Sequence, residues 1–278
     1  MNSHLFQVNT YLTEDIGMGD VTAALIPAHL NANADVITRE AMVVCGQVWF
    51  NAVFYELSQH TMITWQVDEG AEVPAGTLLC QLSGNARVLL SGERTALNWL
   101  QTLSATATQA RQYANAVLGT GCIILDTRKT LPGLRQAQKY AVSIGGCENH
   151  RMGLYDAVLI KENHILAAGS IANAIASARQ QSQLSVEIEV ENLAELQQAL
   201  SAKPDRIMLD NFSLDDMRTA VELRNATAPD ISLEASGNVE LTTIKNIALT
   251  GVDYISVGAL TKNIHAIDLS MRIQLVQE

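Results

Sequence analysis

Hydrophobic and polar positions follow two different patterns along this chain, and the change falls near residue 120. Before it, residues 34–57 predict a strand followed by an amphipathic helix. Residues 62–82 alternate apolar and polar side chains around glycines, which predicts short strands joined by tight turns. Residues 87–118 predict a long helix with leucines along one side. The first part of the chain is therefore expected to mix strands with helices.

Six short apolar segments follow residue 120, and amphipathic segments separate most of them. Ser170, Asn192 and Ser213 each precede a helical pattern, as residues that cap helix N-termini do. Strands that alternate with helices through short connections predict a parallel sheet. We expect an α/β barrel rather than an open sheet, although six strands are fewer than the usual eight. The expected strands are 123–126, 157–161, 186–189, 206–210, 231–234 and 254–257.

The composition narrows the class of protein. With 278 residues, 48% apolar and 17% charged, the chain is expected to form one large or two modest globular domains. A net charge of −11 argues against nucleic acid as a partner, because binding nucleic acid needs a basic face. No apolar run is long enough for a membrane span, and the first residues lack signal-peptide features, so a cytoplasmic location is expected. Four widely spaced cysteines predict buried, reduced thiols.

Positive charge is concentrated in residues 125–164, which hold six of the 18 Lys and Arg residues. Because the chain as a whole is acidic, this cluster predicts a site for a small ligand with several negative charges. The alternative is that the cations pair with nearby carboxylates at residues 126, 148, 156 and 162. The six residues are Arg128, Lys129, Arg135, Lys139, Arg151 and Lys161.

Several of these cations stand where a predicted strand ends. Arg128 and Lys129 follow the first strand of the second pattern, and Lys161 ends the next one. The carboxyl ends of parallel strands form the edge at which ligands bind in sheets and barrels. Glu189 and Asp210 end adjacent strands at the same edge, where they could share a divalent cation or the hydroxyls of a ribose.

Two further features complete this edge. In the string EIEVE, period-two alternation puts Glu187, Glu189 and Glu191 on one face of the strand. Residues 236–238 follow a strand and are expected to open a helix at 239–249, while Gly258 and Ala259 follow the last strand. Glycine-bearing turns and helix N-termini favour phosphate, so we predict a phosphate site here.

The chain contains the strings TRKTLPGLR, KYAV, GG..NHR.GL.D, LIKENHI, EVE, IMLDNF, EASGNV, TGVDYISVGALTK and DLSMR. These strings resemble the quinolinate phosphoribosyltransferase family, and the similarity extends from about Glu14 to Arg272. The resemblance implies an N-terminal α/β sandwich domain, residues 1–112, on which residues 266–278 pack back, and an incomplete six-stranded TIM-like α/β barrel, residues 113–265. The sequence departs from the family pattern at Cys147-Glu148, where a glycine and a small residue are more usual.

The resemblance also implies a reaction, in which quinolinate and phosphoribosyl pyrophosphate give nicotinate mononucleotide, pyrophosphate and carbon dioxide, with Mg²⁺, in the biosynthesis of NAD. It implies a homodimer or a higher oligomer, and no nucleic-acid or membrane partner. The implied quinolinate-binding residues are Arg94 from the partner subunit, Thr127, Arg128, Lys129, His150, Arg151 and Lys161. The implied phosphoribosyl-binding residues are Glu189, Asp210, Ser236, Gly237, Asn238, Val257, Gly258 and Ala259. Catalysis is assigned to Lys129, Lys161, Glu189 and Asp210, of which the last two also bind the metal, directly or through water.

Three other functions are open at this point. A related phosphoribosyltransferase could act on a different acid. A lysine at a barrel strand end could instead form an imine, which would make Lys161 the centre of a Schiff-base lyase. Residues 62–82 resemble the half-barrel of lipoyl and biotinyl carriers, but they contain no lysine to which a cofactor could be attached.

Overall fold

The structure, a computed structural model, describes residues 8–276 and consists of two compact units. The first comprises the chain up to Gln109, Gln136–Gly145 and the chain from Ile264; the second comprises Ala110–Arg135 and Gly146–Asn263. The predicted domain division assigned residues 136–145 to the barrel, whereas the structure groups them with the first unit. Residues 1–7 and 277–278 of the predicted domains lie outside the described part of the chain.

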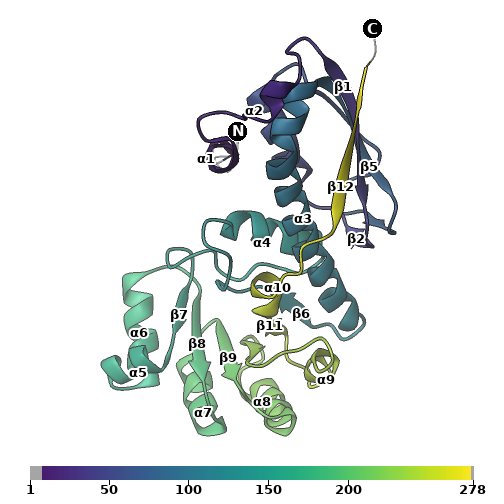
Figure 1. Ribbon diagram of the computed structural model, residues 1–278. Helices are drawn as coiled ribbons and strands as arrows, with labels where there is room; N and C mark the ends of the chain where they lie inside the picture. Colours follow the sequence, from purple (N-terminus) through teal and green to yellow (C-terminus); the bar gives the residue numbers. More distant parts are fainter. Residues whose placement is uncertain (1–7, 277–278) are drawn as a thin grey trace. The chain divides into compact units, whose positions relative to one another are not determined.

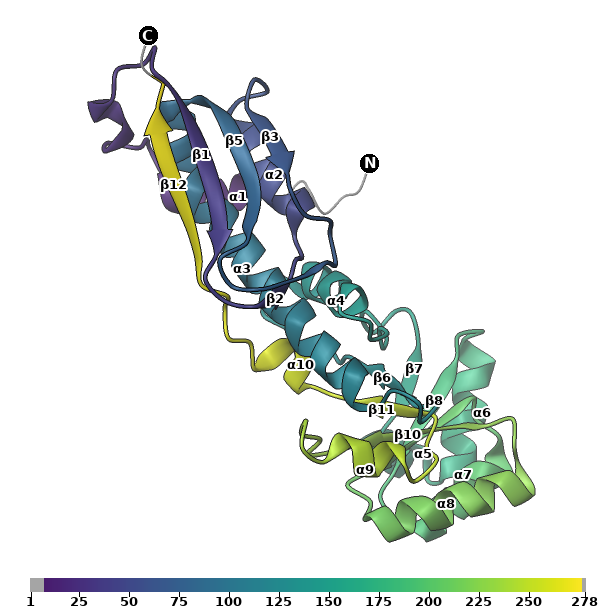
Figure 2. The same ribbon diagram turned by 90° about the vertical axis from the view of Figure 1, so that its right-hand side faces the viewer.

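An antiparallel sheet in the order β12-β1-β5-β3 forms the centre of the first unit. Helices cover one of its faces (Figure 2). The last strand, β12, pairs with β1, so the end of the chain adds an edge strand to the first unit. Its elements are α1 (Val8–Ile16), η2 (Ala23–Leu25), β1 (Asn31–Thr38), β2 (Met42–Val43), α2 (Gln47–Leu57), β3 (Met62–Trp65), β4 (Glu72–Val73), β5 (Leu78–Asn85), α3 (Ala86–Ala116, which continues into the second unit), α4 (Arg135–Ile144) and β12 (Leu269–Leu275).

Burial explains why these segments take their structures. Alternate residues of β1 are buried, which is the period that fits a strand with one face on a core. Phe50 and Phe54 are one helical turn apart in α2 and are both fully buried. The predicted leucine stripe of α3 is confirmed, because Leu89, Leu97, Leu100 and Leu103 are all buried.

The second unit is a parallel sheet of six strands in the order β6-β11-β10-β9-β8-β7, with helices along its outer side (Figure 1). Among the described residues no ladder joins the edge strands β6 and β7, so the barrel is incomplete. The predicted fold class is confirmed. The elements are β6 (Ile123–Leu125), β7 (Val158–Ile160), α5 (Glu162–Ala168), α6 (Ile171–Gln181), β8 (Val186–Val190), α7 (Leu193–Ala202), β9 (Arg206–Asp210), α8 (Leu214–Thr227), β10 (Ser232–Ser236), α9 (Ile244–Ala248), β11 (Tyr254–Ser256) and α10 (Ala259–Lys262).

The predicted helix starts at Ser170, Asn192 and Ser213 are confirmed. Each side-chain oxygen accepts a hydrogen bond from the backbone N–H three residues later, at 3.1, 3.0 and 3.1 Å respectively. These bonds satisfy backbone donors that the helix itself leaves free. They also fix where α6 begins after α5, and where the loops after β8 and β9 end.

The predicted start of the helix at 239–249 is wrong. Residues 241–243 form a turn, and α9 begins only at Ile244. The hydroxyl of Thr243 accepts from the Glu240 N–H at 3.2 Å and donates to the Glu240 carbonyl at 3.1 Å, so this side chain stabilises a turn that competes with the helix. The loop 236–238 therefore does not open a helix, and a helix dipole gives it no affinity for phosphate.

The predicted position of Glu191 on the face of Glu189 is also wrong. Strand β8 ends at Val190, and Glu191 is exposed beyond it, with its N–H donating to the Glu195 carboxylate at 2.9 Å. Only Glu187 and Glu189 face the inside of the sheet from β8.

Two other predictions concern the chain as a whole. All four cysteines are buried, and none forms a disulfide within residues 8–276. Across the same residues, the helices are too short or too polar to span a bilayer.

Candidate active site

The loop after β6 packs directly against the loop after β11. The N–H of Lys129 donates to Thr127 Oγ1 at 3.1 Å, and the Thr261 hydroxyl donates to the Lys129 carbonyl at 2.8 Å. A Cβ on Gly258 would lie 3.1 Å from Lys129 Cδ and 3.6 Å from Thr127 Oγ1. The structure therefore brings two predicted quinolinate-binding residues next to a predicted phosphate-binding residue.

Beside Gly258, the Val257 N–H donates to the Leu125 carbonyl at 2.9 Å, which ties the end of β11 to β6. Val257 is buried, and Ala259 is the first residue of α10. These backbone contacts hold the loop at the carboxyl end of the sheet, as predicted.

A second group of cations lies on the loops around Arg128 and Arg151. The Arg135 guanidinium joins these loops, because it donates to the Arg128 carbonyl at 3.3 Å and to the Met152 carbonyl at 3.1 Å. Burial, followed by the nearby positive charge of Arg128, lowers the pKa of Arg151. The Nε of Arg128 is buried and has no hydrogen-bond partner among the described residues. Arg128 and Arg151 repel each other, and the buried Arg128 Nε lacks a hydrogen-bond acceptor. Both features are expected of a site that binds an anion.

Lys161 and Glu189 form an ion pair across the ends of the neighbouring strands β7 and β8. The lysine side chain is 43% exposed and the glutamate side chain 12%. Both residues were predicted at this edge, and the partner of Lys161 is the inward-facing Glu189 rather than one of the four nearby carboxylates that the alternative interpretation named. The Lys161 side chain therefore lies at the carboxyl end of the sheet, beside the inward-facing Glu189.

Asn211 joins the loops after β9 and β10, and the sequence did not single it out. Its N–H donates to the Ser236 carbonyl at 2.9 Å, and its Nδ2 donates to Asp210 Oδ2 at 2.9 Å. Its backbone is left-handed, with φ of 55°. Gly237 packs on it so closely that a Cβ there would lie 2.1 Å from Asn211 Oδ1. One side chain thus orients a predicted metal-binding carboxylate and seats the predicted phosphate loop, which continues at the exposed Asn238.

We expect Gly237→Ala to raise the KM for phosphoribosyl pyrophosphate, the substrate that the sequence resemblance implies, at least about tenfold. The loop must move away from Asn211, and a residue with φ of +102° tolerates a side chain poorly. Gly119→Ala is the matched control: its φ is +81°, but a Cβ there meets nothing within 4 Å. Steady-state kinetics with each substrate varied in turn measures the effect. Equal KM values in the two variants would contradict the role of this contact.

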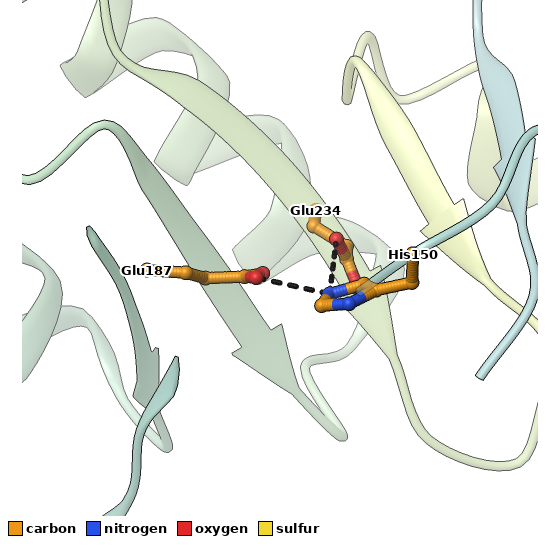
Figure 3. A group of neighbouring side chains, drawn as sticks. All are labelled: His150, Glu187 and Glu234. Carbon is orange, nitrogen blue, oxygen red and sulfur yellow. Dashed lines mark ion pairs between the residues drawn. The ribbon is translucent and has the colours of Figure 1, made fainter. Parts of the chain in front are cut away.

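His150 is held between carboxylates inside the sheet (Figure 3). Its backbone N–H donates to Asp126 Oδ1 at 2.9 Å, and its ring Nδ1 accepts from the backbone N–H of Arg151 at 2.8 Å. Its ring Nε2 lies 2.9 Å from Glu187 Oε2 and 3.6 Å from Glu234 Oε2. The ring therefore carries its proton on Nε2 when it is neutral.

The two carboxylates under His150 are almost inaccessible, with Glu187 5% and Glu234 0% exposed. Arg206 compensates them: its Nη1 lies 2.9 Å from Glu234 Oε2, and its guanidinium stacks 4.0 Å above the Tyr254 ring. Burial, with the charge of Glu187, raises the pKa of Glu234 to about 7, against the opposing effects of His150 and Arg206. Burial lowers the pKa of His150, but the hydrogen bond to Glu187 and the two negative charges outweigh it, and the net pKa is raised.

Curvature of the sheet brings these groups together. Glu187 is on β8 and Glu234 on β10, with β9 between them. In a flat sheet such strands would be roughly 9–10 Å apart. Nevertheless, atoms of His150, Glu187 and Glu234 that could bind a metal all lie within 4.8 Å of one another. The inner faces of the strands therefore converge, as they do in a barrel.

These three atoms are close enough for one ion, but the electrostatics favour a different interpretation. The Arg206 guanidinium already pairs with Glu234 at 2.9 Å, and His150 Nε2 lies 2.9 Å from Glu187 Oε2. A metal ion there would place further positive charge beside the Arg206 guanidinium. We therefore interpret the group as a network of interacting charged side chains rather than as a metal site.

Glu234, Arg206 and Asn211 were absent from the predicted site, and Glu187 was predicted on the face of Glu189 without a role of its own. A signal existed for Glu187 and Glu234, because each is a carboxylate within a largely buried strand. Nothing in the sequence shows that they meet, because that depends on how far the sheet curls. The role of Asn211 depends on a left-handed backbone, which the string LDNF does not specify by itself.

One cation of the cluster, and the predicted quinolinate-binding Arg94, lie in the first unit instead. Lys139 is buried in α4, within the part of the chain that belongs to the first unit. Arg94 is exposed on α3, also in the first unit. The cluster of six thus divides, and the members on the loops of the second unit are Arg128, Lys129, Arg135, Arg151 and Lys161.

The unusual Cys147-Glu148 pair is built into the sheet edge. Glu148 bridges to Leu125 of β6, so the chain runs beside the open edge before reaching His150. The Cys147 thiol donates to the Ala110 carbonyl at 3.2 Å, and burial raises its pKa to about 12, so it is an unreactive thiol. This anchoring fixes the loop from which His150 points inward.

Comparison with known proteins gives the family. The model for the quinolinate phosphoribosyl transferase C-terminal domain matches residues 106–272, and that for the N-terminal domain matches residues 20–104. This chain belongs to the quinolinate phosphoribosyl transferase family.

Individual relatives within the quinolinate phosphoribosyl transferase family match over nearly the whole chain. A probable nicotinate-nucleotide pyrophosphorylase [carboxylating] of Synechocystis is 42% identical over 265 residues, covering 95% of this chain and 90% of the relative. The nicotinate-nucleotide pyrophosphorylase [carboxylating] of Mycobacterium leprae is 39% identical, covering 94% and 93%. The solved structure of the nicotinate-nucleotide pyrophosphorylase from Francisella tularensis superposes with a TM-score of 0.94 at 47% identity, covering 98% and 96%.

Proposed function

We propose that this protein transfers the phosphoribosyl group of phosphoribosyl pyrophosphate to quinolinate and releases carbon dioxide, which gives nicotinate mononucleotide for NAD biosynthesis. Membership of the quinolinate phosphoribosyl transferase family carries the proposal. The cationic loops of the second unit support it independently, because quinolinate carries two carboxylates and phosphoribosyl pyrophosphate carries phosphates. The buried Arg128 Nε is the donor that most needs an anion.

The chemistry requires little more than positioning and charge. As pyrophosphate leaves, the ribose carbon becomes electron-poor and the pyridine nitrogen attacks it. The ring then carries a positive charge on nitrogen, and this charge accepts the electron pair left behind when the adjacent carboxylate departs as carbon dioxide. Arg128 and Arg151 would hold the carboxylates, and Lys129 would stabilise charge on the leaving pyrophosphate. No step needs a covalent bond to the protein.

Magnesium fits the rim of the sheet. Glu189 and Asp210 offer carboxylate oxygens from the adjacent strands β8 and β9, and such oxygens are the ligands that Mg²⁺ prefers. Asn211 holds Asp210 in place through a hydrogen bond of 2.9 Å. We propose that these carboxylates bind Mg²⁺, directly or through water. The same side chains would also bind the ribose hydroxyls. The ion would neutralise the negative charge of the pyrophosphate.

The oligomer and the location are part of the proposal. Arg94 is exposed on a helix of the first unit, as a residue that enters the site of a partner subunit must be. We propose a homodimer in which Arg94 completes the neighbouring site. The cytoplasmic location stays a prediction.

The ion pair of Lys161 disfavours the alternative of a Schiff-base lyase. Imine formation needs a neutral amine, whereas Glu189 stabilises the protonated form of Lys161. A lysine in this state suits an anionic substrate better than a carbonyl.

One assay tests the reaction. Purified protein is incubated with phosphoribosyl pyrophosphate, Mg²⁺ and either quinolinate or nicotinate, and nicotinate mononucleotide and carbon dioxide are measured. We expect product from quinolinate and none from nicotinate. Turnover of nicotinate alone would assign the protein to a different acid, and turnover of neither would overturn the proposed reaction.

A further inference from the structure

Both ring nitrogens of His150 lie close to a neighbouring polar group. Nε2 lies 2.9 Å from Glu187 Oε2, and Nδ1 accepts from the Arg151 N–H at 2.8 Å. A neutral ring held in this way presents a lone pair, not a proton, at Nδ1. An incoming carboxylate would meet that lone pair and be repelled. His150 can donate to an anion from Nδ1 only after this nitrogen takes a proton.

The charges around the ring favour that proton. From β8 comes Glu187, and from β10 comes Glu234, both buried. From β9, Arg206 opposes them, and it is itself paired with Glu234 at 2.9 Å. Asp126 follows β6 and accepts from the backbone of His150, while the cation of Arg151 follows in sequence. The two carboxylates carry one more negative charge than the Arg206 guanidinium neutralises. A protonated His150 ring supplies the second positive charge.

We propose that binding of quinolinate draws a proton from solvent onto Nδ1 of His150, and that Glu187 and Glu234 are the positioning residues that make this uptake favourable. The inference rests on the proposed function, because quinolinate is taken as the ligand.

The step conserves atoms and charge. A proton from the buffer adds to the Nδ1 lone pair, and the hydrogen bond from the Arg151 N–H to Nδ1 breaks. The new Nδ1–H donates to a carboxylate of the ligand, and the freed Arg151 N–H becomes a second donor at the same place. Nε2–H remains on Glu187. The ring becomes an imidazolium between the substrate and the buried acid pair.

The sign of the pH effect follows from this balance. The pKa of His150 is already raised above its usual 6.5 in the ligand-free protein. Proton uptake on binding is therefore largest at pH values above that raised pKa, where the ring is neutral before quinolinate binds. There, each unit of added pH lowers the affinity for quinolinate by up to about tenfold. At pH values below the raised pKa the ring is charged beforehand, and the uptake disappears.

Calorimetry without phosphoribosyl pyrophosphate measures the uptake directly. Quinolinate is titrated into the protein at pH 8 in HEPES and in Tris, whose ionisation enthalpies differ, and the difference in heat gives the number of protons bound. We expect up to about one proton for the wild type. His150→Asn should bind more weakly with no uptake, and Glu187→Gln should lose most of it. His265→Asn, an exposed histidine of the first unit, is the matched control and should behave like the wild type.

The outcomes separate two failures. Binding with equal heats in both buffers overturns the inference while leaving the proposed function intact, and so does an uptake that persists in His150→Asn. No binding together with no quinolinate turnover overturns the proposed function itself. If turnover occurs without measurable heat, the pH dependence of kcat/KM for quinolinate decides: the same slope in the wild type and in His150→Asn overturns the inference.

Discussion

Replacing Lys161 by alanine is expected to lower kcat/KM for quinolinate by about 30- to 1,000-fold, or roughly 2–4 kcal/mol, the scale of losing one preorganised charge contact. Lys161 directly follows β7, is 43% exposed and makes its ion pair with Glu189 at the edge where the substrates are proposed to bind. Its removal leaves an inward-facing carboxylate that repels the anionic substrate as well as losing the cation. Both effects act in the same direction. Steady-state kinetics of nicotinate mononucleotide formation measures the loss.

The fold should survive this change, because a half-exposed ion pair contributes little to stability. The Tm of Lys161→Ala is expected to stay close to that of the wild type. Lys245→Ala, which removes an exposed lysine from α9, is the matched control and should retain full activity. Near-normal turnover in Lys161→Ala would remove the residue from the site. A large fall in Tm would show that the loss comes from the fold rather than from the charge.

The layout of the fold could be predicted from the sequence because it depends on local periodicity. The six strands of the second unit, the capping residues Ser170, Asn192 and Ser213 and the long helix α3 all follow from which positions are apolar and which residues stop a helix. The start of α9 did not follow, since the hydrogen bonds of Thr243 decide it locally against a helical pattern. The pairing of the last strand with β1 came only from resemblance, because no local signal encodes a partner more than 200 residues away.

The candidate site divides in the same way. Its rim could be predicted, because residues such as Lys161 and Asp210 lie at or just beyond strand ends, and parallel strands end at one edge. The network beneath the rim could not, since Glu187 and Glu234 meet across an intervening strand only when the sheet curls. The close approach of Gly237 to Asn211 depends on backbone angles of two separate loops. A sequence specifies which residues face inward more readily than it specifies which inward-facing residues touch.

Mixing two inactive variants is expected to restore activity. Arg94→Ala and Lys161→Ala should each be nearly inactive alone, since Arg94 is proposed to reach the site of the partner subunit and Lys161 belongs to the chain's own second unit. In a dimer with one chain of each kind, one site has both residues and the other has neither. Random exchange of equal amounts makes half of the dimers mixed, so recovery to about a quarter of wild-type turnover is expected.

The control is a mixture of Lys161→Ala with Arg128→Ala, two residues of the same unit. No mixed dimer of this pair contains an intact site, so its activity should stay at the level of the separate variants. Subunit exchange is verified by labelling one variant with an affinity tag and recovering both chains. Recovery in both mixtures would show that the variants regain activity for another reason. No recovery in the Arg94→Ala mixture, despite verified exchange, would place Arg94 outside the neighbouring site.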